Sequence, residues 1–245
     1  MDKLIIHPSW EGLASFVRHL PTSFSDEGKV LRDARNKVRL MSMDGVNLVV
    51  KQYKRPLFHQ RLDYTFIRPS KAKRAYLFAE RLLALGFQTP APIACLEVYR
   101  GGLFYQGYFV SAYCNKPDLS FLRTNSENQE ALLDAFAAYL VQLHERGFLH
   151  GDCNLSNFMY DFSDGRYTFS TIDINRSRFV EHPSQEKCLK NLMRLTHDRV
   201  LLEKIVSRYA ACRNWDAVTC LSQVTKYLDE FEKRNQRKKL LLGRK

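Results

Sequence analysis

The stretch His150-Gly151-Asp152-Cys153-Asn154-Leu155-Ser156-Asn157 decides how this 245-residue chain is interpreted. It puts a carboxylate, Asp152, five positions before an amide, Asn157, just after an amphipathic segment that ends at Gly147. Sixteen residues beyond Asn157, Asp173 lies in an apolar, strand-like run. One carboxylate to accept a hydroxyl proton, with an amide and a second carboxylate to hold Mg²⁺, is the residue set of phosphoryl transfer on a kinase-like scaffold.

A turn alone could also explain these side chains, because Asp and Asn often satisfy turn backbones. Phosphoryl transfer is favoured by the preceding sequence Leu143-His144-x-x-Gly147-Phe148-x-His150 and by the apolar run around the later carboxylate. We therefore predict Asp152 as the catalytic base and Asn157 and Asp173 as the Mg²⁺ ligands. His150 is expected to pack beneath the loop, near the metal-binding carboxylate, rather than to react.

The second element of the predicted site is Lys51, which ends the apolar run Leu48-Val49-Val50 and would contact the nucleotide α- and β-phosphates. Such a lysine usually pairs with a helix glutamate, and Glu80 is the only acidic residue in the helix expected over 70–86. Glu80 is the predicted partner, although its late position in the helix leaves a solvated role open. Gly28 is predicted either to cover the phosphates or to form a simple turn, since no G-x-G-x-x-G motif is present.

Composition narrows the class of protein. The net charge of +12 favours anionic partners, and 45% hydrophobic residues support a globular core. The sequence contains no long apolar span and no signal peptide, so a cytoplasmic protein is expected. The six cysteines show no Cys-x-x-Cys spacing, which favours reduced, packed thiols, including Cys153, over zinc or redox sites.

Hydrophobic periodicity indicates the order of elements. A short helix is expected over 9–20, strands over 30–50 around Asp44-Gly45, a helix over 70–86 capped by Ser70, strands over 93–99 and 103–113, a helix that begins at a capping box Ser126-x-x-Gln129 and ends at Gly147, and helices near 186–196, 198–211 and 215–234. This order predicts an α+β, bilobal, protein-kinase-like fold. The N-lobe, 1–113, would hold an antiparallel sheet plus one helix, and the C-lobe, 114–245, would be mostly helical.

Several segments together resemble the Kdo/heptose lipopolysaccharide core kinase family, a branch of the protein-kinase-like fold. They are Arg35-Asn36-Lys37, Val49-Val50-Lys51, Ser70-Lys71-Ala72-Lys73-Arg74-Ala75, Gly86-Phe87-Gln88-Thr89-Pro90-Ala91-Pro92, His150-Gly151-Asp152-x-Asn154-x-x-Asn157 and Ile172-Asp173-Ile174-Asn175-Arg176. The chain departs from the family pattern at Ala75 and Leu77, where a helix glutamate is expected, and at Ala112, where an acidic residue is common.

The resemblance implies an ATP- and Mg²⁺-dependent enzyme that phosphorylates a sugar hydroxyl, of Kdo or heptose, in the lipid A–core region. It implies the roles given above, a catalytic role for Asn154, and nucleotide contacts for Tyr113 and Cys114. Arg176 would either face the anionic acceptor or brace its loop.

A glycolipid substrate would also give the basic segments a function, because an anionic membrane surface attracts Lys and Arg. We therefore expect a peripheral protein on the cytoplasmic face of the inner membrane, contacting it through Lys54, Arg55, Arg61, Arg68 and the tail 233–245. No nucleic-acid partner is expected. Two alternatives remain open from the sequence: a small-molecule (aminoglycoside-like) or RIO-like protein kinase, and a pseudokinase that serves as a binding module.

Overall fold

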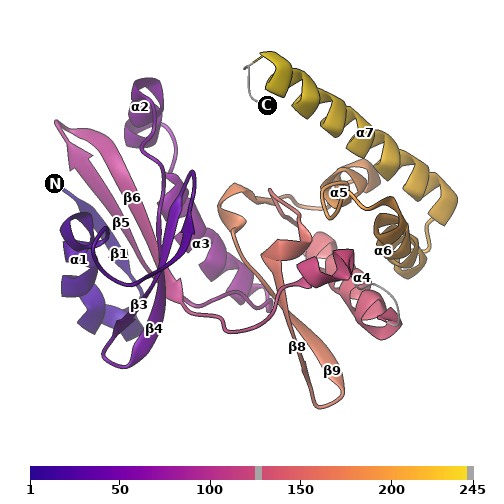
Figure 1. Cartoon of the computed structure of the whole chain (residues 1–245), viewed down its shortest axis with the longest axis horizontal. Helices are drawn as coiled ribbons and strands as arrows, with labels where there is room; N and C mark the ends of the chain where they lie inside the picture. The colour runs from indigo at the N-terminus through magenta and orange to yellow at the C-terminus, as the bar shows by residue number, and fades with distance from the viewer. Residues whose placement is uncertain (125–128, 242–245) are drawn as a thin grey trace. The chain divides into compact units, whose positions relative to one another are not determined.

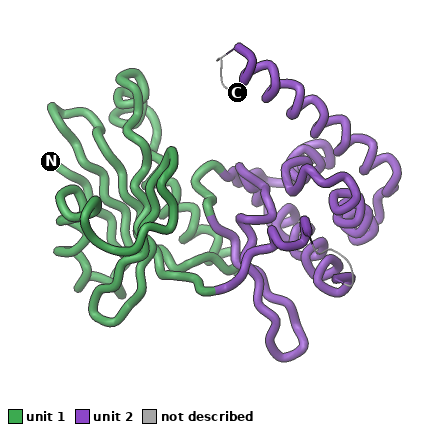
Figure 2. The backbone as a smooth tube through the Cα atoms, viewed as in Figure 1, with its two compact units in different colours: residues 1–115, 173–176 green, residues 116–172, 177–245 purple. Residues whose placement is uncertain are grey.

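The computed structural model describes residues 1–124 and 129–241 (Figure 1). Contacts divide the chain into two compact units, shown in Figure 2. Unit 1 contains residues 1–115 and 173–176, and unit 2 contains the rest. The sequence predicted a single boundary between residues 113 and 114, whereas in the structure the short segment 173–176 also belongs to unit 1. No helix among the described residues is both long and apolar enough to cross a bilayer.

Unit 1 is built on a six-stranded antiparallel sheet with the order β1-β5-β6-β4-β3-β2. Its strands are β1 (Lys3–Ile6), β2 (Lys29–Asp33), β3 (Lys37–Met43), β4 (Val46–Gln52), β5 (Pro92–Arg100) and β6 (Leu103–Ala112). Asp44 and Gly45, with φ of 50° and 77°, form the tight turn between β3 and β4. This turn sets the register that puts Lys51 opposite Val38 on one side and Phe109 on the other.

The two faces of this sheet are covered by different helices. Leu48 and Val50 belong to a core with Val17 and Leu20 of α1 (Ala14–Ser23), which follows a 3-10 helix, η1 (Pro8–Leu13). The opposite face packs on α3 (Lys71–Ala84) through a second cluster that includes Tyr53. Because strand side chains alternate between faces, Lys51 lies on the α3 face of the sheet.

Unit 1 also contains a helix that the sequence did not predict, α2 (Phe58–Phe66). The predicted helices over 9–20 and 70–86 are present as η1 with α1 and as α3. Ser70 caps α3 as expected, since its hydroxyl accepts a hydrogen bond from the backbone N–H of Lys73 at 3.2 Å.

Unit 2 is mostly helical. Its elements are η2 (Leu119–Arg123), α4 (Glu130–Glu145), β7 (Phe148–Leu149), η3 (Leu155–Asn157), β8 (Phe158–Ser163), β9 (Arg166–Thr171), β10 (Arg178–Phe179), α5 (Gln185–Leu192), α6 (Arg199–Cys212) and α7 (Ala217–Leu241). Helix α4 is almost entirely buried on its apolar side and packs on α6, which packs on α7. Of the predicted capping box, Gln129 is the N-cap of α4, and Ser126 lies outside the described residues.

A glycine fixes the path from α4 into the stretch 150–157. Gly147 has φ of 79°, and a Cβ at this position would lie 2.4 Å from the carbonyl oxygen of Val180. Only glycine tolerates both the left-handed backbone and this close approach. Gly147 therefore ends α4 and directs the chain through β7, which pairs with β10, toward His150.

Candidate active site

The loop 150–157 of unit 2, which holds the predicted base, is organised around the imidazole of His150, which is 2% exposed. Its Nδ1 accepts a hydrogen bond from the backbone N–H of Asp152 at 3.0 Å. The other ring nitrogen, Nε2, therefore carries the proton and donates to the carbonyl oxygen of Ile172 at 2.9 Å. As predicted, His150 packs beneath the loop, and it connects the backbone of Asp152 to Ile172, the residue that precedes Asp173.

A second polar network supports this loop from below. The side-chain amide of Asn191 donates to the carbonyl oxygen of His150 at 2.7 Å and accepts from its backbone N–H at 3.2 Å. His144, 1% exposed, bonds the same amide oxygen through Nε2 and the hydroxyl of Tyr209 through Nδ1. Burial lowers the pKa of His144 to about 4, so the imidazole is neutral in the folded protein at pH 7.

This buried histidine predicts an acid-sensitive fold. Unfolded His144 titrates near 6.5, so between pH 6.5 and 4 the unfolded chain binds more protons than the folded one. The free energy of unfolding should fall by ~2 kcal/mol between pH 7 and pH 5 from this group alone. Urea unfolding of the wild type and His144→Gln at both pH values measures it. The variant should lose this part of the pH dependence, whereas His59→Gln, at an exposed position of α2, should keep it. An equal pH dependence in His144→Gln would contradict the assignment.

Asp152, the predicted base, forms an ion pair with Arg194 at 2.7 Å. Its side chain is 31% exposed, so the carboxylate remains accessible to a substrate hydroxyl. The side-chain amide of Asn157 donates to the backbone carbonyl of Asp152 at 2.8 Å, which leaves the Asn157 amide oxygen available as a ligand. Arg194 was not predicted from the sequence, because nothing in the sequence around an isolated arginine indicates that its side chain will contact Asp152.

Asn154 has a local structural role. Its side-chain oxygen accepts from the backbone N–H of Ser156 at 3.1 Å, which caps η3. The same oxygen accepts from the guanidinium of Arg123 at 2.5 Å. These contacts hold the turn between Asp152 and Asn157. Cys153, within the same turn, is 1% exposed and burial raises its pKa, which favours packing over nucleophilic chemistry.

In unit 1, two predicted site residues meet although they lie 122 positions apart: Lys51 Nζ lies 2.7 Å from Asp173 Oδ1. Their side chains are 15% and 30% exposed, respectively. The side-chain amide of Asn175 donates to the same carboxylate oxygen at 2.5 Å. Asp173 has φ of 54°, a left-handed conformation that Asp tolerates better than most residues. Two groups thus fix the orientation of this carboxylate.

A cluster of cations gathers in the same unit. Burial is the largest cause that lowers the pKa of Lys71, at the start of α3, and the positive charges of Arg35, Arg176, Arg74 and Arg68 contribute in that order, so that together they bring it to about 8. Arg176 comes from η4 (Ile174–Arg176), which follows Asp173 and packs on α3. A bound anion would relieve the repulsion among these cations. The sequence alone did not indicate a role for Lys71.

The remaining predicted nucleotide contacts lie elsewhere in unit 1. Lys51 forms its ion pair with Asp173, and Glu80 forms none with Lys51 among the residues that the structure describes. Gly28 precedes β2 with φ of 74°, and a Cβ there would lie 2.5 Å from the carbonyl oxygen of Leu40, which gives it a structural reason to be glycine. Tyr113 follows β6, and its hydroxyl bonds Asn115 at 3.2 Å; Cys114 is partly exposed. The nucleotide roles of these residues remain predictions.

Comparison with known proteins identifies the family. A family model described as lipopolysaccharide kinase (Kdo/WaaP) family matches residues 17–219. No match was found among curated proteins. A solved structure of WaaP in complex with acyl carrier protein is 17% identical with a TM-score of 0.62, over 96% of this chain and 98% of that chain. The Rio2 kinase–ADP/Mg²⁺–phosphoaspartate complex from Chaetomium thermophilum is 15% identical with a TM-score of 0.50, over 96% and 78%.

The two structural likenesses confirm the predicted fold class, an α+β protein-kinase-like fold with an antiparallel sheet and a mostly helical second half. The family match confirms the resemblance seen in the sequence segments. Membership implies use of ATP and action on the lipopolysaccharide core. Because the matching model spans most of the sequence, the chain belongs to the lipopolysaccharide kinase (Kdo/WaaP) family and is a phosphotransferase that acts on hydroxyl groups.

Proposed function

We propose that this kinase transfers the γ-phosphoryl group of ATP to a hydroxyl of an inner-core sugar, Kdo or heptose, of lipopolysaccharide at the cytoplasmic face of the inner membrane. The observation that carries the proposal is the ion pair between Lys51 and Asp173. Within one compact unit, this ion pair joins Lys51, which would bind the nucleotide phosphates, to Asp173, which would bind Mg²⁺.

The predicted metal ligands have the chemistry that Mg²⁺ prefers. Mg²⁺ prefers oxygen ligands, commonly takes only one or two carboxylates from the protein, and completes its shell with phosphates and water. Asp173 and Asn157 offer such oxygens. No cluster of three or more His, Cys, Asp or Glu occurs in the described part of the chain, so the donor set does not suit a structural zinc site. When bound, Mg²⁺ would neutralise phosphate charge as the γ-phosphoryl group is transferred.

The chain's own residues would perform three tasks. Lys51, with the cations around Lys71, would hold and orient the phosphates, a task that needs position and charge rather than proton transfer. Asp152 would orient the acceptor hydroxyl and receive its proton. Arg194, whose guanidinium carbon lies 5.0 Å from the centroid of the Phe231 ring, would orient the Asp152 carboxylate through their ion pair.

The decisive experiment offers the purified kinase three classes of acceptor: deacylated inner-core oligosaccharide that lacks core phosphate, a panel of proteins, and aminoglycosides. We expect Mg²⁺-dependent turnover of ATP with the oligosaccharide only. Fragmentation mass spectrometry of the product should show one added phosphoryl group and assign it to the Kdo or the heptose fragment.

Two results would contradict the proposal. Turnover with proteins or aminoglycosides, but not with the oligosaccharide, would move the acceptor to another class. Binding of Mg·ATP without turnover on any acceptor would support the alternative of a pseudokinase.

A further inference from the structure

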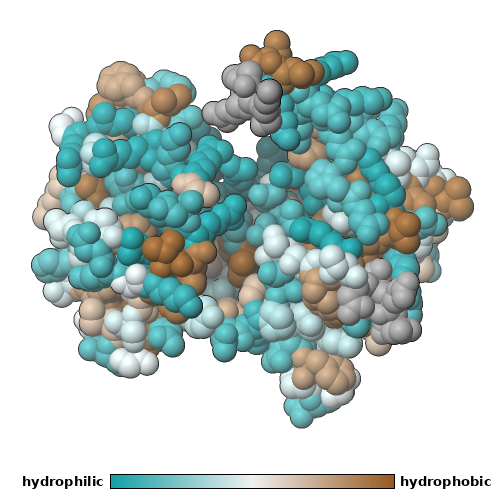
Figure 3. Space-filling model, in the orientation of Figure 1, coloured by the Kyte–Doolittle hydropathy of each residue, from teal (hydrophilic) through white to brown (hydrophobic). Residues whose placement is uncertain are grey.

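Helix α2 of unit 1 exposes the face that a helix of a globular protein normally buries. Phe58, Leu62 and Phe66, spaced four apart along one stripe, are 64%, 38% and 74% exposed. Leu57 and Ile67, at the two ends of the helix, are 65% and 81% exposed. Figure 3 shows hydrophobic surface over α2 with hydrophilic surface beside it. A contiguous exposed apolar surface of this kind marks an interaction site.

The opposite face of α2 is fixed to the sheet, so the exposed stripe is held outward. Tyr64 is buried against the edge of the Phe104 ring, with the ring centroids 5.4 Å apart. The hydroxyl of Thr65 accepts from the backbone N–H of Phe104 at 2.9 Å, and Arg61 Nε donates to its carbonyl oxygen at 2.9 Å. These contacts engage one side of the helix and leave the side with Phe58 and Phe66 unpartnered.

Cations flank the apolar stripe. From Lys51 to Arg74 the chain has eight Lys or Arg and one acidic residue, Asp63, which pairs with Arg68 at 2.5 Å. Lys54 and Arg55, directly before α2, are exposed. The helix therefore combines projecting apolar side chains with positive charge on both sides.

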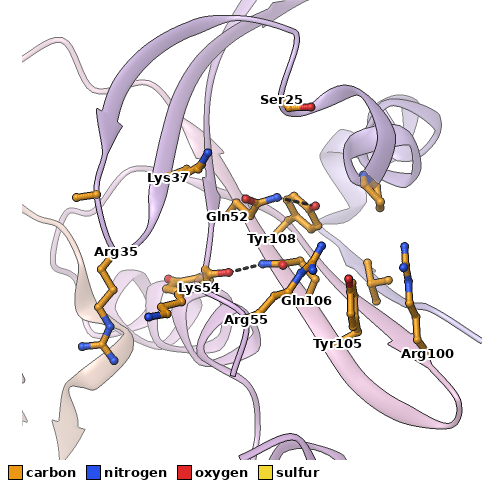
Figure 4. A pocket seen from close by; sticks show the side chains of 14 residues that line it. Ser25, Arg35, Lys37, Gln52, Lys54, Arg55, Arg100, Tyr105, Gln106 and Tyr108 are labelled. Carbon is orange, nitrogen blue, oxygen red and sulfur yellow. Dashed lines mark hydrogen bonds between the residues drawn. The ribbon is translucent and has the colours of Figure 1, made fainter. Parts of the chain in front are cut away.

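A basic pocket adjoins this helix on the face of the sheet opposite Lys51. It has a volume of about 560 Å³ and is lined by Gln52 and Tyr108, by five cations, and by none of the acidic residues that the structure describes. The five cations are Arg35, Lys37, Lys54, Arg55 and Arg100. Figure 4 shows Tyr105 between two of them, and the Arg55 and Arg100 guanidinium carbons each lie 4.3 Å from its ring centroid.

The pocket and the helix are joined through Arg61. Its guanidinium lies 5.9 Å from the Tyr105 ring and donates to the carbonyl oxygen of Arg100 at 3.4 Å. The apolar stripe and the basic pocket are therefore neighbouring parts of one surface, which we call the α2 surface: Leu57, Phe58, Leu62, Phe66 and Ile67 with Lys54, Arg55 and Arg100.

We infer that the α2 surface docks this kinase on an anionic phospholipid bilayer, with the apolar stripe inserted at the headgroup–acyl boundary and a lipid phosphate held in the basic pocket. The charge of the surface complements anionic lipid. Its apolar side chains project outward instead of lining a groove, which suits insertion into an interface better than docking of a protein segment. The inference deepens the proposed function, since a lipid-anchored sugar lies at such an interface.

The test measures binding of the full chain to vesicles. Phosphatidylglycerol/phosphatidylethanolamine vesicles should bind the wild type in preference to phosphatidylcholine vesicles. Phe58→Ser with Phe66→Ser should weaken binding at least about tenfold at both low and high salt, because two phenyl groups leave the interface. Arg55→Gln with Arg100→Gln should weaken binding to the anionic vesicles mainly at low salt. Phe162→Ser, at a 58% exposed phenylalanine of β8, is the matched control and should bind as the wild type does.

A second readout reports insertion directly. Fluorescence of Phe66→Trp should be quenched by lipids brominated on the acyl chain, whereas that of Phe162→Trp should change only as the wild-type fluorescence does. Unchanged vesicle binding of Phe58→Ser/Phe66→Ser, or an unquenched Phe66→Trp, would overturn the inference. Free phosphate that displaced the chain from vesicles would identify the pocket as the site of the phosphate contact, whereas binding unaffected by phosphate and by the arginine substitutions would overturn that part.

Turnover of soluble core oligosaccharide separates this inference from the proposed function. Phe58→Ser/Phe66→Ser should retain it, because α2 does not contribute to the candidate active site. If the proposed function were wrong, oligosaccharide turnover would be absent in every variant while the differences in vesicle binding persisted.

Discussion

Replacement of Asp152 by Asn should lower kcat for core-oligosaccharide phosphorylation by about 10²- to 10⁴-fold, the range expected for loss of a general base. Asparagine has the same shape and can still accept a hydrogen bond from Arg194, which lies 2.7 Å from the carboxylate, but it cannot take up the acceptor proton. The affinity for Mg·ADP should change little, because Lys51 and its neighbours, rather than Asp152, are predicted to bind the nucleotide. Single-turnover kinetics and calorimetric nucleotide titration measure the two effects.

The matched control is Asp134→Asn, which removes an exposed carboxylate of α4 that pairs with Arg208. It should leave kcat within about twofold of the wild type, since surface ion pairs contribute little. An Asp152→Asn enzyme with wild-type kcat, or one that loses kcat only because it fails to fold, as judged by circular dichroism, would remove the support for Asp152 as the base.

Replacement of Asp173 by Asn should abolish the Mg²⁺ dependence of nucleotide binding. In the wild type, Mg²⁺ should increase the affinity for ADP, because Asp173 would hold the ion and the ion would neutralise phosphate charge. The variant should lose this increase, and its kcat/KM should fall by at least about 10³-fold, since a metal ion contributes several kcal/mol to transition-state stabilisation. Titration of ADP with and without Mg²⁺ is the measurement.

The control for this second prediction is Asp161→Asn, at a partly exposed position of β8 that pairs with Lys116 at 3.6 Å. It should keep the Mg²⁺ effect. A persistent Mg²⁺ effect in Asp173→Asn would show that the ion is held elsewhere. Loss of ADP binding even without Mg²⁺ would instead point to the freed Lys51 ammonium, whose partner within 2.7 Å would have lost its charge.

Much of the fold follows from local patterns in the sequence. Helix α3 was predicted from its apolar stripe and Ser70 cap, and β4 from an apolar run after the Asp44-Gly45 turn, because each element satisfies a periodicity and has a turn or capping signal. Strand β2 was not predicted as a separate strand, since all its residues are exposed and show no alternation. Helix α2 was not predicted, although Phe58, Leu62 and Phe66 recur at helical spacing; that this stripe faces outward is visible only in the structure.

In the candidate site, too, local features were predictable from the sequence and tertiary contacts were not. The spacing from Asp152 to Asn157 indicated a loop, and the loop is present with His150 buried beneath it. The pairing of Arg194 with Asp152 in unit 2 and the cluster of cations around Lys71 in unit 1 were not predicted, because each forms only through packing of segments that are distant in sequence. For the same reason the expected partner of Lys51 was a helix glutamate, whereas the structure pairs Lys51 with Asp173.

The grouping of Asp173–Arg176 with unit 1 has a consequence for enzyme motion. The backbone passes between the units three times, after Asn115, after Ile172 and after Arg176. If the two units move as bodies during a catalytic cycle, the Lys51–Asp173 pair travels intact with unit 1, and the carboxylate of Asp152 travels with unit 2. The predicted phosphate contacts and the predicted base would then belong to separate bodies, which the backbone connects at three places.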